Sequence, residues 1–161
     1  MLELLGGDPE FYEMASIPMP LELEASVTEG FREVDGCIVP KSFTLPLILS
    51  EAKPRSANQH DETSFECSIH EVSIDAYFSR DTDFTELARS GCDFAWIVRR
   101  ELLRSNVQGP IRIIVSAQPP DPQLRVGQTC TVRFHRLRPG QVWLADDLEG
   151  YKLEAIAVFE F

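Results

Sequence analysis

The most regular pattern in the chain is an apolar stripe with helical spacing between residues 83 and 105. Asp83 is a suitable N-cap, and Glu86 follows three residues later, as in a capping box. Arginines occupy the last turns, where they interact favourably with the negative end of the helix dipole. The sequence therefore predicts one principal helix over 83–105, whose apolar face carries Phe84, Leu87, Ala88, Gly91, Phe94, Ala95, Val98 and Leu102.

Other segments predict strands, because they alternate between apolar and polar residues or form short apolar runs bounded by turn residues. The alternation changes parity near His70, which predicts a β-bulge or a bend there. Asp8 and Pro9 favour the start of a short helix over 8–14. The expected strands are 21–27, 37–39, 43–49, 65–78, 111–117, 129–137, 142–144 and 151–161.

Together these elements predict the fold class. Only the helix over 83–105 is long enough to connect two parallel strands, so we expect antiparallel pairing. We predict an α+β fold, in which a bent antiparallel sheet or partial barrel is covered by this one principal helix. The 161 residues suffice for a single domain over 1–161 with its own core. Residues 51–64 contain almost nothing to bury and predict a mobile surface loop.

Targeting signals and cysteine usage predict a cytoplasmic location. No apolar run approaches the roughly 20 residues that span a bilayer. The acidic opening, soon interrupted by two glycines, does not have the pattern of a signal peptide. The four cysteines are scattered without a CxxC pair, at positions 37, 67, 92 and 130. We therefore expect reduced cysteines, a cytoplasmic protein and no membrane partner.

The charge of the chain is strongly acidic and unevenly distributed. The net charge is −11, and residues 1–80 carry 15 acidic but only 5 basic side chains. Such a charge repels phosphate backbones, so we expect no duplex nucleic acid as a partner. It serves solubility, or it steers a protein partner that has a basic surface. The candidate contact residues for such a partner are Glu22, Glu24, Asp61, Glu62 and Asp75, with Trp96 as an aromatic anchor.

Motifs of known catalytic and metal sites are absent from the sequence. There is no GxxxxGK[ST], GxGxxG, GxSxG or HExxH, so we expect no cofactor and assign no catalytic residue. Cys67 and His70 come nearest to a metal pair. However, residues three apart in a strand point to opposite faces, and no other close pair supplies the remaining zinc ligands. Glu22 and Glu24 would serve acid–base chemistry only if one of them were buried.

An arginine-rich segment supplies a second hypothesis. Residues 99–138 contain eight arginines and only two acidic residues. The alternation in 129–137 places Arg133 and His135 on the outward face of a strand, with Phe134 inward. Together with Arg112, these side chains would form a cleft for a phosphate or carboxylate. The simpler interpretation is that they lie on a solvated strand face.

The sequence thus leaves two main functional hypotheses and one structural alternative. The first is an acidic, non-enzymatic protein-binding module, of the inhibitor or immunity type, that masks a basic partner. The second is a small enzyme or an anion- or nucleotide-binding domain that uses Arg112, Arg133 and His135. A structural subunit, whose exposed apolar residues are covered by neighbouring chains, is the third.

Overall fold

The computed structural model describes residues 18–42, 61–123, 125–145, 147–151 and 153–161. It combines helices with two antiparallel sheets, which confirms the α+β class. The expected helix over 8–14, the expected strand over 43–49 and positions 51–60 of the expected loop lie outside the described residues. No helix within these described ranges is long and apolar enough to cross a bilayer.

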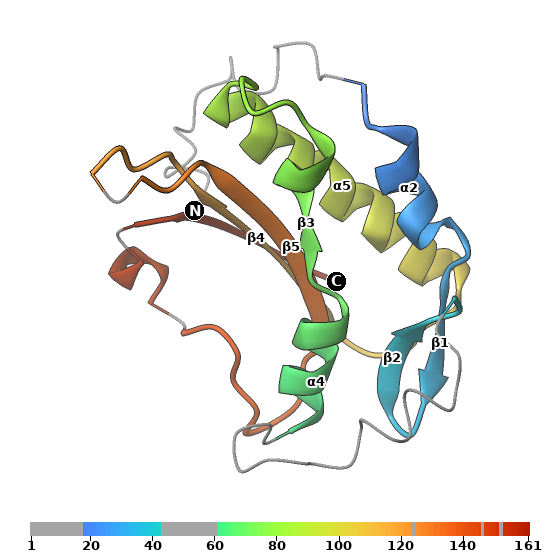
Figure 1. Cartoon of the computed structure of the whole chain (residues 1–161). Helices are drawn as coiled ribbons and strands as arrows, with labels where there is room; N and C mark the ends of the chain where they lie inside the picture. Colours follow the sequence, from blue (N-terminus) through green and yellow to red (C-terminus); the bar gives the residue numbers. More distant parts are fainter. Residues whose placement is uncertain (1–17, 43–60, 124, 146, 152) are drawn as a thin grey trace.

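The larger sheet has four strands in the order β3-β5-β4-β6, and it curves along its length (Figure 1). Its central pair is β4 (Ile111–Gln118) and β5 (Thr129–Arg136), joined by a ladder of eight opposed residue pairs. β6 (Ala155–Glu160) pairs with β4, and the short β3 (Val72–Ser73) pairs with β5. All pairs are antiparallel, as expected, and the described sheet is open rather than closed into a barrel.

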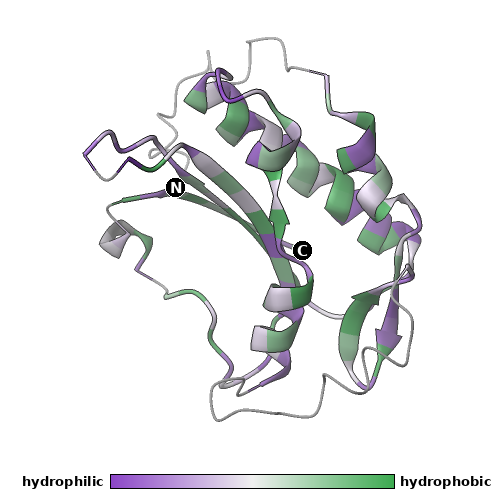
Figure 2. Cartoon of the chain, viewed as in Figure 1, coloured by the Kyte–Doolittle hydropathy of each residue, from purple (hydrophilic) through white to green (hydrophobic). Residues whose placement is uncertain are grey.

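The principal helix, α5 (Phe84–Arg104), lies across one face of this sheet (Figure 1). The side chain of Asp83 accepts a hydrogen bond from the backbone N of Thr85 at 2.8 Å, so the predicted N-cap is confirmed. Apolar residues of α5 face those of the strands across the core (Figure 2). The helix lies close to the sheet at Gly91, where an added Cβ would lie 2.6 Å from Cys130 Sγ. The missing side chain thus permits the close contact.

The expected strand over 21–27 is wrong, because these residues form the helix α2 (Leu21–Thr28). Pro20 precedes its first turn, and the buried side chains are Leu23 and Val27, four residues apart. Leu21 is exposed, so only half of the apparent alternation is used for burial. A hairpin follows, formed by β1 (Phe31–Val34) and β2 (Cys37–Pro40), which confirms the strand expected at 37–39.

The expected strand over 65–78 is also wrong for most of its length. Residues 62–69 form the helix α4 (Glu62–Ile69), and only β3 and the 3-10 helix η1 (Ile74–Tyr77) follow. Residues 61–64, which were expected to end a mobile loop, therefore form the N-cap and the first turn of α4. The helix buries Thr63, Glu66 and Cys67, of which two are polar, so an apolar stripe was not visible in the sequence.

The second face of the large sheet is partly covered by the segment that connects β5 to β6. Leu144 from this segment is buried against Ile114 and Ile156 of the sheet. The segment contains the 3-10 helix η2 (Leu148–Gly150), whereas the expected strand over 142–144 is not formed. Regular strand pairing begins again only at β6, later than the expected start at residue 151.

Candidate functional site

The acidic residues expected to contact a partner lie on separate elements. Glu22 and Glu24 belong to α2, where Glu24 forms an ion pair with Arg100 of α5 at 3.3 Å. Asp61 caps α4 by accepting a hydrogen bond from Ser64 N at 2.7 Å. Glu62 accepts one from Gln141 Nε2 at 2.6 Å.

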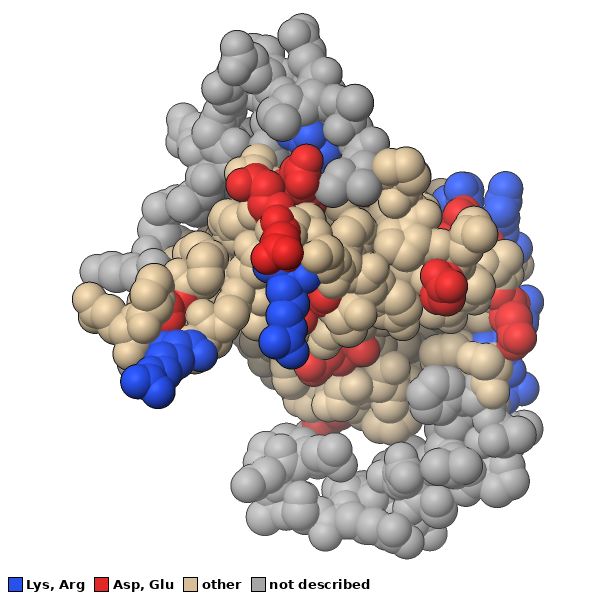
Figure 3. Space-filling view, turned by 45° about the horizontal axis from the view of Figure 1, so that its top comes forward, with Lys and Arg blue, Asp and Glu red and all other residues tan. Residues whose placement is uncertain are grey.

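On the face drawn in Figure 3, acidic side chains lie in several places, with uncharged and basic surface between these places. The remaining carboxylate of the expected set, Asp75, belongs to η1 and accepts a hydrogen bond from the backbone N of Cys130 at 3.0 Å. The described part of the chain therefore does not bring these carboxylates into one patch, and most of them have a local structural partner.

Trp96, the expected aromatic anchor, lies on α5 with 55% of its surface exposed. Its ring meets Phe159 of β6 edge to face, with 5.7 Å between the ring centroids. The guanidinium of Arg99 lies over Trp96 at 5.5 Å and over Phe161 at 5.0 Å. These four residues form the Trp96 patch, an aromatic cluster at the surface that includes a cation stacked on two rings.

The structure brings Arg112, Arg133 and His135 together on one face of the sheet, as the alternation predicted. Arg112 and His135 are directly opposed in the ladder between β4 and β5. Each arginine already has a carboxylate partner. Arg112 Nη2 lies 2.6 Å from Glu160 Oε1, and Arg133 Nη2 lies 3.1 Å from Glu71 Oε2.

His135 departs from the expectation in its burial, since only 1% of its surface is exposed. Its Nδ1 donates a hydrogen bond to the backbone oxygen of Arg136 at 2.9 Å, because a carbonyl can only accept. Burial lowers the pKa of His135, and the positive charges of Arg112 and Arg138 act in the same direction. The imidazole is therefore neutral at pH 7 and adds no positive charge for an anion.

The most strongly connected polar group is Glu66, which the sequence analysis did not single out. Its carboxylate is fully buried and receives both guanidinium nitrogens Nη1 and Nη2 of Arg138, at 2.8 and 2.9 Å. The backbone N atoms of Ile38 and Arg136 donate to it at 2.6 and 2.7 Å. This group ties α4 to β2 and to the end of β5, and both of its oxygens are already occupied.

His70 and the cysteines are buried in ways that restrict their chemistry. The His70 ring stacks on Phe134 at 3.8 Å, and burial lowers its pKa to about 4. Burial likewise raises the pKa of Cys67 to about 12, so the Cys67 thiol near His70 in the sequence is protonated at neutral pH. Among the described residues, no group of three or more His, Cys, Asp or Glu side chains has an arrangement that would hold a metal ion.

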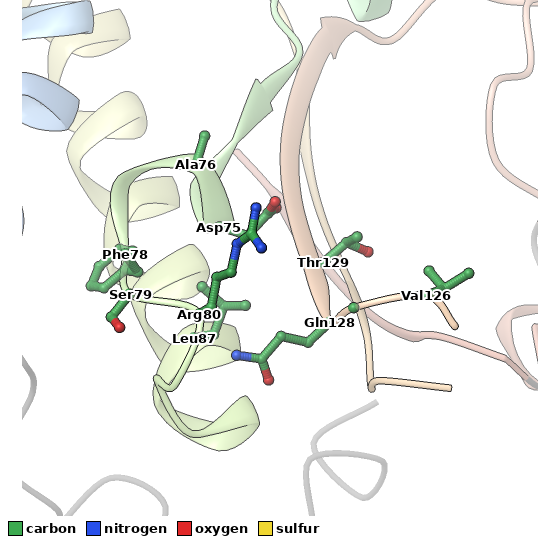
Figure 4. Close-up of a pocket in the computed structure, with 10 residues that line it drawn as sticks. Asp75, Ala76, Phe78, Ser79, Arg80, Leu87, Val126, Gln128 and Thr129 are labelled. Carbon is green, nitrogen blue, oxygen red and sulfur yellow. The ribbon is translucent and has the colours of Figure 1, made fainter. Parts of the chain in front are cut away.

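A pocket of about 640 Å³ lies between the segment 75–80 and the residues that lead into β5 (Figure 4). Two hydrogen bonds connect its walls. Asp75 accepts from Cys130 N at 3.0 Å, and Gln128 Nε2 donates to the backbone oxygen of Thr82 at 2.5 Å. The buried side chain of Leu87 from α5 contributes to the lining. The volume is within the range of roughly 300–1,000 Å³ that is common for small-molecule sites.

Comparison with protein families identifies the group to which the chain is related. A family model described as the Uncharacterized protein PM0498 family matches residues 10–161. The chain belongs to this family. The matched residues include every described element from α2 to β6, and therefore the residues of both the Trp96 patch and the pocket. No curated protein and no solved structure matches the chain.

Proposed function

We propose that the chain is an acidic, non-enzymatic protein-binding module that masks a basic partner, as an inhibitor or immunity-type protein does. The observation that carries this proposal is the Trp96 patch. Tryptophan and arginine are the residue types most enriched among the dominant contacts of protein interfaces. A half-exposed tryptophan, already held by Phe159 and Arg99, loses little conformational freedom when a partner covers it.

The charge of the chain supports a basic partner. A net charge of −11 accelerates the approach of a basic protein over long range, whereas affinity comes from the apolar contact that follows. The acidic contact set therefore acts through its summed field and does not require one continuous patch. Glu22 remains the best placed of its members, because it is exposed on α2 and has no partner among the described residues.

The state of the titratable groups favours binding over catalysis. Glu66 uses both carboxylate oxygens in the pair with Arg138 and in two backbone hydrogen bonds. An anion at Arg112 and Arg133 would have to displace Glu160 and Glu71. The four cysteines are free thiols, and we propose a reducing, cytoplasmic location on that basis.

The experiment is affinity capture from native lysate with the wild-type chain, Trp96→Ala and Val142→Ala, at low and at high salt. Val142 is 74% exposed and lies in the segment between β5 and β6, outside the patch, so its variant controls for the loss of any exposed apolar side chain. We expect a basic protein that is captured by the wild type and by Val142→Ala but is strongly reduced with Trp96→Ala. Its capture should weaken at high salt. Equal recovery by Trp96→Ala, or no captured protein at either salt concentration, would refute the proposal.

A further inference from the structure

Two side chains of opposite charge line the pocket of Figure 4 without forming an ion pair with each other. Asp75 uses Oδ1 for the hydrogen bond from Cys130 N, and its second oxygen has no partner among the described residues. Arg80 forms no hydrogen bond or ion pair with any described residue. A single small pocket thus contains one available carboxylate oxygen and one available guanidinium.

The rest of the lining is largely apolar. Phe78, Leu87 and Val126 contribute hydrophobic surface, and Leu87 is only 1% exposed to solvent. A hydrophobic lining with a few polar groups at fixed positions is the usual composition of a small-molecule site. Asp75 and Gln128 are held in place by their hydrogen bonds, which connect the two walls of the pocket.

The pair of opposite charges restricts the ligand. A simple anion would be attracted by Arg80 but repelled by Asp75. A simple cation would be attracted by Asp75 but repelled by Arg80. A ligand with both charges satisfies both side chains at once, and its own ammonium and carboxylate remain hydrogen-bonded when water is displaced. We propose that this pocket binds a small zwitterion, a free amino acid or short peptide with an apolar side chain. Its ammonium group contacts Asp75, and its carboxylate contacts Arg80.

This site is separate from the Trp96 patch, because the two share no residue. Capture of a protein partner and binding of the zwitterion can therefore succeed or fail independently.

The test is a titration of the full chain at pH 7, followed by amide NMR shifts and by calorimetry. Four probes separate the charges and the sizes: leucine, leucinamide, N-acetylleucine and leucyl-leucine. Leucinamide lacks the carboxylate, and N-acetylleucine lacks the ammonium group. We expect saturable binding of leucine or leucyl-leucine with the largest shifts at residues 75–80 and 126–129, and weaker binding of both blocked probes. The ratio of the leucine and leucyl-leucine affinities distinguishes an amino acid site from a peptide site.

Two variants assign the contacts. Arg80→Gln should weaken zwitterion binding about tenfold or more and leave leucinamide binding unchanged, because a charge-assisted hydrogen bond is lost. Asp75→Asn retains an oxygen that accepts from Cys130 N, and should weaken leucine and leucinamide but not N-acetylleucine. Lys41→Gln removes one exposed positive charge at the end of the β1–β2 hairpin, and controls for the change in net charge.

Three results would overturn the proposal. The first is the absence of saturable binding of either zwitterion at millimolar concentration. The second is equal affinity for leucine and its two blocked forms. The third is unchanged zwitterion binding by Arg80→Gln, whose folding is not at risk because Arg80 is exposed and has no partner among the described residues.

Discussion

Glu66 and Arg138 form a bidentate ion pair in the interior, although 72 residues separate them in the sequence. Arg138 also donates from Nη2 to the backbone oxygen of Gly36 at 2.8 Å. Burial acts to lower the pKa of Arg138, but its hydrogen bonds to Glu66 and the attraction of that carboxylate keep the pKa above its ordinary value. Arg138 therefore stays charged, and its pair with Glu66 joins α4, the β1–β2 hairpin and the end of β5.

Removal of one partner of this pair should strongly destabilise the fold. Glu66→Ala leaves Arg138 without its carboxylate partner and two backbone N–H groups without their acceptor, and should cost about 3–5 kcal/mol in urea unfolding. The double variant Glu66→Leu with Arg138→Met should recover part of this loss, because no unpaired charge remains buried.

The exposed pair of Glu24 and Arg100 is the control for this prediction. Glu24→Ala should leave stability almost unchanged, since solvent screens both groups. A Glu66→Ala variant as stable as the wild type would contradict the assigned role of the buried pair.

The burial of His70 should make stability depend on pH. Its folded-state pKa is lowered to about 4, whereas the unfolded chain titrates near 6.5. As the pH falls through this window, the unfolded state takes up a proton that the folded state does not. Stability should therefore decrease from pH 6.5 towards pH 4, by up to about 1.4 kcal/mol per pH unit.

Denaturant titrations between pH 4.5 and 7 measure this slope. His70→Phe keeps a ring that stacks on Phe134 but does not titrate, so its slope should be smaller. A residual slope of the same sign should remain, because burial lowers the pKa of His135 as well. Equal slopes for the wild type and His70→Phe would show that His70 is not the titrating group.

The helix α5 and the central strands were predictable because their signals are local and repeated. Asp83 caps the helix, and its apolar residues recur over many turns on the face that is buried. The alternation in 111–117 and 129–137 matches β4 and β5 closely. In the two strands, the period of the sequence and the period of burial agree except at Ile114 and His135, which are buried on the other face of the sheet.

The helices α2 and α4 were not predictable in this way. Each has only two or three buried positions, and short runs of apolar residues fit either period. In α4 the decisive buried residue is a glutamate, whose burial depends on an arginine that lies far along the chain. The ion pairs of Arg112 and Arg133 also depend on carboxylates that are distant in the sequence. The face on which these arginines lie was therefore predicted correctly, but their pairing with Glu160 and Glu71 was not.

The thiols should be unreactive in the native state. Burial raises the pKa of Cys37 and Cys92 to about 11 and that of Cys67 and Cys130 to about 12, so thiolate is scarce at pH 8. Only Cys92 is partly exposed, and it should react first with a disulfide reagent such as DTNB. All four thiols should react rapidly in denaturant. If any thiol reacted at that rate in the native protein, the result would contradict the burial of that cysteine.

The contact between α5 and the sheet predicts the effect of a methyl group at Gly91. Alanine favours a helix by about 1 kcal/mol over glycine. Here, however, its Cβ would lie 2.6 Å from Cys130 Sγ and 2.9 Å from Val115 Cγ1, and overpacking a core costs about 1–3 kcal/mol. Gly91→Ala should therefore lower the free energy of unfolding. Gly91→Ala should cost less in a Cys130→Ala background, because the sulfur atom that lies nearest to the added Cβ has been removed. An equal cost in both backgrounds would show that the contact with Cys130 is not the source of the strain.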